Sequence, residues 1–339
     1  MKEYYRTQKG RAFLGDFIHL FNKNLKKHYK NKFQLIITSP PFPLNNKKQY
    51  GNLDGEEYLQ WFSLLGPIFT DLLKDDGSLI IEIGNAWEKN RPVQSLLPLE
   101  ALLRLVNRSE SKLRLIQEFI VYNPSRLPSP AQWVTVNRIR VVDSYTRIWW
   151  IAKTDFPKAD NRRVLRPYSK EMKRLLAKKK YNAGTRPSGH VIRQQTFLKD
   201  NMGSISPNFF ELEPIEEREK IRLPHNVLKF ANTASNDFFL KRCRELNIKP
   251  HPARMHPGII AFFIEFLTDE NDLVLDPFAG SNTTGYVAEI LNRRWISCEI
   301  KEEYVKQSQI RFEDPVLRQT KEEFQNENFN LTTRGNTVD

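Results

Sequence analysis

The sequence predicts an α/β fold with a mostly parallel central sheet. Short apolar runs bounded by Gly, Pro or acidic residues recur along the chain, as buried strands do, and amphipathic helical patterns lie between several of them. The chain has 339 residues, which suggests about two domains or one large domain with an insertion. A hydrophobic fraction of 40% is typical of a globular protein and excludes intrinsic disorder as its main state.

Apolar runs predict the strands, taken in chain order. They are residues 12–14, 33–37, 78–83, 115–122, 147–152, 273–275 and 295–298. The clearest predicted helix runs from Tyr58 to Leu72, whose apolar residues fall on one helical face, and the Asp75-Asp76-Gly77 turn is expected to end it. A further helix is predicted from Thr284 to Ile290, directly after a Gly-containing turn.

The chain changes character between residues 156 and 248. This stretch is polar and rich in Pro and Asn, and it shows no clear alternation of strands and helices. Residues 156–200 contain thirteen Lys or Arg and three acidic residues, so their net charge is +10. We interpret residues 156–248 as an inserted recognition region, and we expect a polar tail at 316–339.

The whole chain carries a formal net charge of +13, and the first 32 residues contribute +7. Such a balance favours a polyanionic partner, most often nucleic acid, although solvated basic faces are the alternative. The apolar runs are too short to cross a bilayer, and the N-terminus has no apolar signal segment. The two cysteines, Cys243 and Cys298, provide neither a metal-ligand pair nor a disulfide framework, so we expect no metal site and a cytoplasmic location.

The first candidate site follows the strand predicted at 33–37. Two prolines in Ser39-Pro40-Pro41-Phe42 fix φ and remove two N–H donors, which gives a stiff loop with acceptor carbonyls. Ser39 Oγ and the Pro40 carbonyl can accept both hydrogens of an amino group on a flat ring, and Phe42 can stack on that ring. Accepting both hydrogens leaves the nitrogen lone pair available for attack. An ordinary Pro-Pro turn is the alternative.

The second candidate site is the run Asp276-Pro277-Phe278-Ala279-Gly280-Ser281-Asn282-Thr283-Thr284-Gly285, which joins a strand to a helix. Backbone amides at such a turn bind a polar or anionic group. Glu299 stands at the end of the next strand, and an acid about 20 residues after a Gly-rich turn commonly binds a ribose. The pattern favours an adenosine-containing cofactor. A plain strand–helix turn with a solvated Glu299 is the alternative.

These two motifs resemble those of the β-group amino-methyltransferases of bacterial restriction–modification systems, which use S-adenosylmethionine (SAM). The likeness covers nearly the whole chain. It also includes Lys47 to Asn52, Asn123-Pro124-Ser125, Leu127 to Pro130, Trp149-Trp150, Thr185 to His190 and His251 to Arg254. The catalytic loop comes first, the recognition region next and the cofactor loop last, as in the circular permutation of that group.

The resemblance implies a fold and a domain order. The fold would be a Rossmann-like SAM-dependent methyltransferase sheet, circularly permuted, with an inserted DNA-recognition domain. Residues 1–155 would form the catalytic half, 156–248 the target-recognition region and 249–315 the SAM-binding half.

The resemblance also implies roles for individual residues. Ser39, Pro40, Pro41 and Phe42 would be catalytic. Glu82 would be a further acceptor for the target amino group, and a strand-end acid at a helix N-terminus or in water is its alternative. The cofactor-binding set would be Asp16, Pro252, Ala253, Asp276, Phe278, Gly280, Ser281, Asn282, Thr283 and Glu299.

DNA contacts are expected from the basic region. A base inside duplex DNA cannot reach such a loop, so the target must be flipped out. Phosphate contacts are expected from Arg162, Arg163, Arg166, Lys173 and Arg174. Base contacts are expected from Arg186, Ser188, His190 and Arg193, for which phosphate contact or solvent is the alternative.

The leading hypothesis is a site-specific DNA methyltransferase that acts on cytosine N4 and protects host DNA from a cognate restriction endonuclease. Ser39, in place of Asp or Asn before Pro-Pro, favours cytosine N4 over adenine N6 within this family. Carbon-5 methylation is excluded because neither cysteine follows a proline. The alternatives are an adenine-N6 methyltransferase, a non-catalytic nucleic-acid-binding protein and an enzyme acting on RNA. We expect a monomer or a weak dimer.

Overall fold

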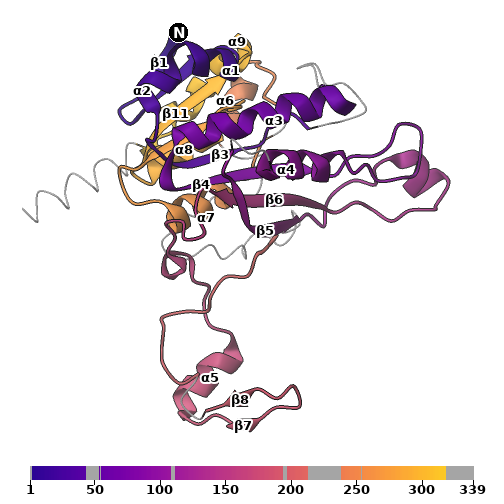
Figure 1. Ribbon diagram of the computed structural model, residues 1–339, viewed down its shortest axis with the longest axis vertical. Helices are drawn as coiled ribbons and strands as arrows, with labels where there is room; N and C mark the ends of the chain where they lie inside the picture. Colours follow the sequence, from indigo (N-terminus) through magenta and orange to yellow (C-terminus); the bar gives the residue numbers. More distant parts are fainter. Residues whose placement is uncertain are drawn as a thin grey trace, which may run out of the picture.

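The computed structural model describes residues 2–42, 53, 55–107, 111–193, 197–212, 238–252 and 254–317. Ala253, the segment from Lys47 to Asn52 and most of the predicted polar tail lie outside these residues. Figure 1 shows a large α/β body with a smaller lobe hanging below it.

Within the described residues, the body is built on a sheet of nine strands in the order β1-β2-β11-β10-β3-β4-β6-β5-β9. The strands are β1 (Lys2–Arg6), β2 (Gly10–Leu14), β3 (Phe33–Thr38), β4 (Leu73–Gly84), β5 (Arg114–Tyr122), β6 (Tyr145–Ala152), β9 (Phe209–Glu211), β10 (Leu273–Asp276) and β11 (Arg294–Glu299). Neighbouring strands from β2 to β4 are parallel, whereas β6 is antiparallel to both β4 and β5. Each predicted strand is confirmed, with ends that differ by a few residues.

Helices cover both faces of the sheet. Side chains of α1 (Phe17–Leu20), α3 (Gly55–Leu72) and α4 (Leu97–Asn107) join one apolar cluster, and those of α7 (Pro257–Leu267), α8 (Thr283–Ile290) and α9 (Glu302–Ser308) join another. Along β3, Ile36 faces the first cluster while Leu35 and Ile37 face the second. A strand buried on both faces reads as a continuous apolar run, which is why its sequence predicted it.

Shorter helical elements complete the body. They are η1 (Phe21–Leu25), α2 (Lys26–Tyr29), η2 (Gln132–Val136), η3 (Asn161–Val164), α6 (Phe238–Glu245) and η5 (Gln309–Glu313). The predicted end of helix α3 at Leu72 is confirmed, but the Asp75-Asp76-Gly77 run does not end the helix, because it lies inside β4. The helix stops at Leu72 and β4 starts at once, and the Asp75-Asp76-Gly77 turn lies where the β3–β4 register shifts between Phe33↔Leu73 and Leu35↔Ser78.

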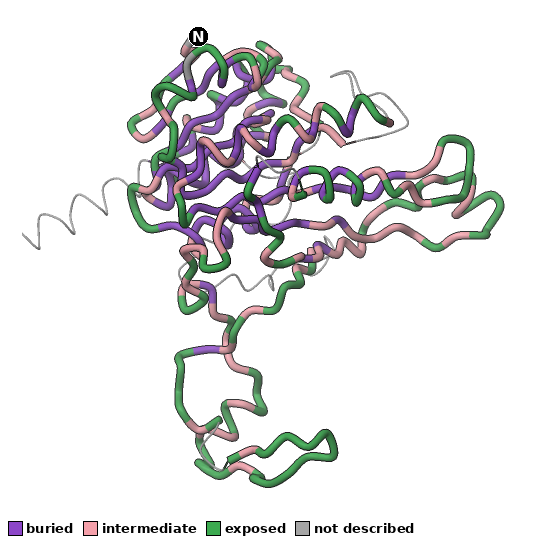
Figure 2. The backbone as a smooth tube through the Cα atoms, in the orientation of Figure 1, coloured by how far each residue is buried: buried purple, intermediate pink, exposed green. Residues whose placement is uncertain are grey.

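Only part of the predicted recognition region stands apart from the body. Residues 167–193 and 197–203, here called the basic lobe, contain α5 (Lys170–Lys178) and the hairpin strands β7 (Gly184–Thr185) and β8 (Val191–Ile192). Figure 2 shows that the lobe is mostly exposed, and no side chain of α5 is buried. Three other elements of the predicted recognition region belong to the body. Helix η3 contacts α7, strand β9 extends the main sheet, and α6 packs against η5.

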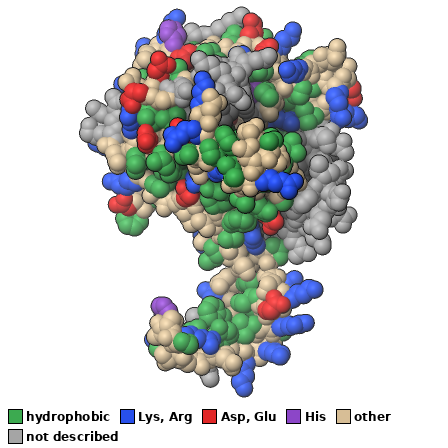
Figure 3. Space-filling model, turned by 90° about the vertical axis from the view of Figure 1, so that its right-hand side faces the viewer, with side chains coloured by type: hydrophobic (Ala, Val, Ile, Leu, Met, Phe, Trp, Pro, Cys, Tyr) green, Lys and Arg blue, Asp and Glu red, His purple; other side chains and the backbone are tan. Residues whose placement is uncertain are grey.

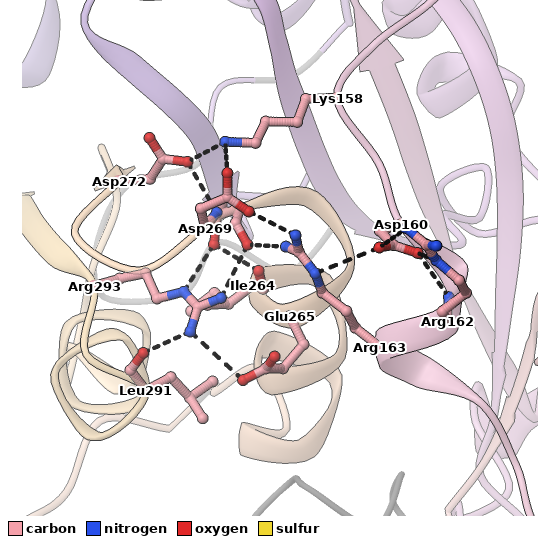
Figure 4. A network of polar contacts seen from close by, with 11 residues as sticks. Lys158, Asp160, Arg162, Arg163, Ile264, Glu265, Asp269, Asp272, Leu291 and Arg293 are labelled. Carbon is pink, nitrogen blue, oxygen red and sulfur yellow. Dashed lines mark hydrogen bonds and ion pairs between the residues drawn. The ribbon is translucent and has the colours of Figure 1, made fainter. Parts of the chain in front are cut away.

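Arg293 anchors a buried polar network behind the sheet (Figure 4). Its guanidinium donates to Thr268 Oγ1 at 3.0 Å, to the Thr268 carbonyl at 2.9 Å and to the Leu291 carbonyl at 2.6 Å. It also lies 3.6 Å from Glu265 of α7. The guanidinium of Arg293 therefore donates to the backbone carbonyls of Thr268 and Leu291, and it provides a counter-charge for the half-buried carboxylate of Glu265.

The same network fixes the point where the basic lobe leaves the body. Arg163 of η3 donates to the Thr268 carbonyl at 2.7 Å and to Asp269 at 2.6 Å. Lys158 pairs with both Asp269 and Asp272, at 2.5 and 2.8 Å. These contacts hold the chain before the lobe against the loop that leads into β10.

Arg293→Met should lower the free energy of unfolding by about 2–4 kcal/mol, because Glu265 loses its buried counter-charge and the Leu291 carbonyl loses a donor. Chemical denaturation measures the change. The matched control is Arg294→Met at the adjacent exposed position, where we expect a loss of about 0.5 kcal/mol. Equal small losses in both variants would contradict this role for Arg293.

Candidate active site

The candidate site lies where parallel strands end. The chain leaves β10 through α8 to β11 on one side, and leaves β3 through α3 to β4 on the other, so the sheet has a switch point between β10 and β3. Ligands of open α/β sheets bind outside the carboxyl ends of the strands at such a point. A cavity of about 240 Å³ opens there.

Both predicted motifs face this cavity. The predicted residues that line it are Asp16, Ser39, Pro40, Pro41, Phe42, Asp276, Phe278, Gly280, Ser281, Thr283 and Glu299. They come from the loops after β2, β3, β10 and β11. Segments more than 200 residues apart in the sequence therefore share one pocket.

Asp276 connects the two motifs. Its carboxylate accepts hydrogen bonds from the hydroxyl of Thr38, at the end of β3, at 2.9 Å and from that of Thr284, in α8, at 2.7 Å. The backbone N–H of Phe278 donates to it at 3.1 Å. One buried side chain thus holds the end of β3, the turn after β10 and the start of α8 in a fixed arrangement.

Burial raises the pKa of Asp276 to about 6, although the hydroxyls of Thr284 and Thr38 act in the opposite direction. The folded state therefore favours the protonated carboxyl more than the unfolded state does. This contribution to stability is fully present below the unfolded pKa and is lost as the pH rises through about 6. At neutral pH, the fold retains an ionised and buried Asp276 at a cost in stability.

Glu299 supports the turn around Gly280 from behind. Its two carboxylate oxygens accept from the backbone N–H groups of Gly280 and Lys301, each at 2.9 Å. Burial raises the pKa of Glu299, and these backbone donors oppose that shift. A carboxylate has about four acceptor positions, so Glu299 can also accept a hydrogen bond from a hydroxyl group of a ligand.

Gly280 occupies a position that other residues would not fit. Its φ is +51°, and a Cβ built there would lie 3.0 to 3.2 Å from the ring of His251. The backbone therefore approaches the His251 ring closely, which a side chain would prevent. His251 and Arg254, from the segment before α7, also line the cavity.

Aromatic side chains form one wall of the cavity. The ring of Phe278 lies 5.6 Å from that of Trp61 and 5.9 Å from that of Phe17, and Tyr58 lies 5.7 Å from Trp61. The hydroxyl of Tyr58 is buried and has no hydrogen-bond partner within the described residues, so a ligand could provide one. This wall was not predicted from the sequence, although Tyr58 and Trp61, three residues apart near the start of the helix that follows the Ser39–Phe42 loop, were a readable signal.

Phe42 and Glu82 lie near the same strand end but are placed differently. Phe42 lines the cavity and packs so closely on Gly84 that a Cβ there would lie 2.9 Å from its ring. Glu82 does not line the cavity and instead accepts from the hydroxyl of Thr146 at 3.3 Å. Burial raises the pKa of Glu82 to about 7. Because Thr38 pairs with Ile81, Glu82 stands near the start of the Ser39–Phe42 loop without lining the cavity, and its catalytic role stays a prediction.

Two further cofactor candidates also lie outside the cavity lining. Asn282 is the N-cap of α8, where its side chain accepts from the Gly285 N–H at 3.0 Å and donates to the hydroxyl of Tyr5 at 2.9 Å. It therefore shapes the turn from within the body. Pro252 does not contribute to the lining, whereas its neighbour His251 does.

Comparison with known proteins assigns the sequence that builds this site to a family. The family profile described as DNA methylase (N6_N4_Mtase) matches residues 33–310, which include both motifs. The chain belongs to the DNA methylase family.

Individual relatives agree with this assignment. The chain is 41% identical over 322 residues to the type II methyltransferase M.PvuII of Proteus hauseri, covering 94% of this chain and 88% of that protein. It is 26% identical over 284 residues to M.BglII of Bacillus subtilis, covering 81% and 62%. The solved PvuII DNA methyltransferase (cytosine-N4-specific) matches with a TM-score of 0.68 and 32% identity, over 94% of this chain and 95% of that one. The family resemblance predicted from the motifs is confirmed.

The basic residues of this DNA methylase occupy several places. Lys173 and Arg174 lie on α5, and Arg186, Ser188, His190 and Arg193 lie in or beside the β7–β8 hairpin, all in the basic lobe and all exposed. Figure 3 shows Lys and Arg side chains gathered along one side of this lobe.

Other predicted phosphate contacts lie at the root of the lobe. Arg162 pairs with Asp160 at 2.8 Å and is exposed, and Arg166 donates to the Phe209 carbonyl at 3.2 Å. Arg163 belongs to the internal network of Figure 4. The basic N-terminal residues lie elsewhere, because Arg6, Lys9 and Arg11 line a cavity beside the amino ends of β10 and β11.

The described part of this DNA methylase offers few groups for other chemistries. It contains no cluster of three or more His, Cys, Asp or Glu that could hold a metal ion. Cys243 and Cys298 are both buried, and burial raises the pKa of the Cys298 thiol. The helices of the described residues include none that is long and apolar enough to span a membrane.

Thr284→Val should raise the pKa of Asp276 further, because the hydroxyl of Thr284 stabilises the ionised carboxylate. Carboxyl-carbon NMR titration of the variant measures this shift. Thr283→Val is the matched control, since Asp276 accepts its side-chain hydrogen bonds from Thr284 and Thr38, and it should leave the pKa unchanged. A lower pKa in Thr284→Val would contradict the assigned hydrogen bond.

Proposed function

We propose that this protein is a site-specific DNA methyltransferase that transfers a methyl group from SAM to the exocyclic N4 of a cytosine flipped out of duplex DNA. One observation carries the proposal: the Ser39–Phe42 loop and the Gly280 turn, with Glu299 behind it, line the same cavity. The acceptors for an amino group and the site for a cofactor therefore face one space. The name of the 41% identical relative and of the matching solved structure support the chemistry.

The residues of the cavity fit SAM. Glu299 has acceptor positions for ribose hydroxyls, and Phe17, Trp61 and Phe278 provide an aromatic wall for an adenine ring. The turn at Gly280 packs closely on the ring of His251, which also lines the cavity. When bound, SAM supplies an activated methyl group on a sulfonium centre.

The catalytic loop would prepare the target nitrogen. Ser39 Oγ and the Pro40 carbonyl accept the two amino hydrogens, and Phe42 stacks on the cytosine ring. This favours a tetrahedral nitrogen whose lone pair points away from both acceptors. Transfer is then direct, without a metal and without a covalent link to the protein, which agrees with two buried cysteines.

The choice of cytosine N4 over adenine N6 rests on Ser39 and on the cytosine-N4-specific relative. Nucleoside mass spectrometry tests it directly after the protein is incubated with unmethylated duplex DNA and SAM. N4-methylcytosine is the expected product. N6-methyladenine would overturn the base assignment, and no SAM binding at all would favour a non-catalytic DNA-binding protein.

The wider role follows from the same proposal. Methylation would protect host DNA from a cognate restriction endonuclease in the cytoplasm, as the type II names of the relatives suggest. A monomer or weak dimer would methylate each strand in turn. The basic lobe would contact the duplex through Lys173, Arg174 and the β7–β8 hairpin, and the arginines at its root, Arg162 and Arg166, would reach flanking phosphates.

Ser39→Ala should lower kcat by about 100-fold while leaving SAM affinity nearly unchanged, because an acceptor for the amino hydrogen is lost and the cofactor turn is untouched. Single-turnover methylation and SAM titration measure the two quantities. Ser63→Ala, in the middle of α3 and away from the cavity lining, is the control. A collapse of SAM binding with unchanged turnover per bound SAM would contradict the role of Ser39.

The double variant Lys173→Ala, Arg174→Ala should bind duplex DNA with a weaker salt dependence. The slope of the logarithm of the binding constant against the logarithm of the salt concentration should become shallower by about two, since each lost phosphate contact lowers it by about one. Titration of DNA at several salt concentrations measures this slope. Lys9→Ala is the control, because Lys9 lies at the opposite edge of the sheet. An unchanged slope in the double variant would mean that Lys173 and Arg174 of α5 do not contact DNA phosphates.

A further inference from the structure

Two loops extend beyond the carboxyl edge of the sheet. Residues 85–96 follow β4, and residues 123–144 join β5 to β6. Because β6 is antiparallel to both β4 and β5, the two loops leave the sheet at the same edge. Figure 1 shows them on the right, past the ends of α4 and β6. The cavity of the candidate active site opens at this edge as well.

The outer part of the second loop, residues 137–142, is here called the tip loop. The side chain of Arg140 joins it to the first loop. The guanidinium lies 3.5 Å from the centre of the Trp87 ring and donates to the Pro92 carbonyl at 3.0 Å. The Ile139 N–H also donates to the Trp133 carbonyl at 3.0 Å. The tip loop therefore has a defined conformation rather than a free end.

This fixed tip loop exposes aliphatic side chains to water. Ile139 is 61% exposed and Val141 is 87% exposed. Arg138, with φ of +55°, stands beside them at the bend. Ordering apolar groups in water brings no gain in burial, so a fixed apolar tip indicates a partner. Arg138 beside them indicates which partner fits, since apolar groups and a cation together match the bases and phosphates of a nucleic acid.

Packing contacts lead from the tip loop to Phe42, the ring that is proposed to stack on the target base. Phe42 packs on Gly84. The next residue, Asn85, donates from its side chain to the carboxylate of Asp143, which directly follows the tip loop, at 2.7 Å. Trp87 comes three residues after Gly84, so their Cα atoms are within about 11 Å. A continuous chain of contacts therefore joins the stacking ring to the tip loop.

We propose that the tip loop is a DNA wedge: Ile139 and Val141 enter a groove of the duplex beside the flipped cytosine, and Arg138 binds a flanking phosphate. The proposal rests on the function proposed above. Apolar side chains that enter a base step offset the cost of unstacking it, which is a few kcal/mol. Arg140 is a positioning residue, because its stacking on Trp87 holds the tip loop in place.

The test compares two DNA substrates with the variant Ile139→Ser, Val141→Ser. One is a matched duplex that carries the methylation site mapped in plasmid DNA, and the other replaces the guanine opposite the target with an abasic site, so that the cytosine is already unpaired. We expect kcat/KM on the matched duplex to fall about tenfold or more, since the wedge no longer offsets unstacking. On the abasic duplex it should stay within about twofold of the wild type, because less unstacking is needed.

Leu103→Ser is the matched control, because this exposed aliphatic residue lies on α4 rather than in the tip loop. It should leave kcat/KM unchanged on both substrates. An equal loss on both substrates, or no loss on the matched duplex, would overturn the wedge. If the wild-type protein itself forms no N4-methylcytosine in plasmid DNA, the proposed function fails, and the wedge fails with it.

Discussion

The arrangement of this molecule depends on one buried carboxylate. Asp276 ends β10 at 6% exposure and accepts three hydrogen bonds, from Thr38, Thr284 and the Phe278 N–H. Burying an ionised acid is costly unless hydrogen bonds replace its water. Here the donors come from separate segments. The carboxylate is therefore stable only when the end of β3, which leads into the Ser39–Phe42 loop, is packed against the turn after β10.

That constraint explains how a chain with distant motifs forms one pocket. The end of β3 is fixed by Thr38, which directly precedes the Ser39–Phe42 loop, and Phe42 in turn packs on Gly84 at the end of β4. From Gly84 the contacts continue through Asn85 to the tip loop. The acid that organises the pocket also weakens the fold at neutral pH, since its pKa is raised to about 6. Function and stability therefore compete at this residue.

Much of the fold was readable from the sequence because its strands are buried on both faces and appear as apolar runs. Side-chain directions were not readable. Asn282 stands inside the cofactor motif, yet its left-handed backbone directs the amide to Gly285 and Tyr5. Glu82 was assigned by position along β4, but its partner Thr146 comes from a neighbouring strand. The limits of the basic lobe were not predicted, because its helix α5 is amphipathic but short and buries no side chain.

The most direct test of the shared pocket is a crystal structure of the protein with S-adenosylhomocysteine, the product form of the cofactor. We expect the ribose hydroxyls on Glu299, the adenine against the wall of Phe17, Trp61 and Phe278, and the sulfur facing the Ser39–Phe42 loop. A ligand bound elsewhere, or one whose sulfur points away from Ser39, would contradict the claim that both motifs serve one reaction.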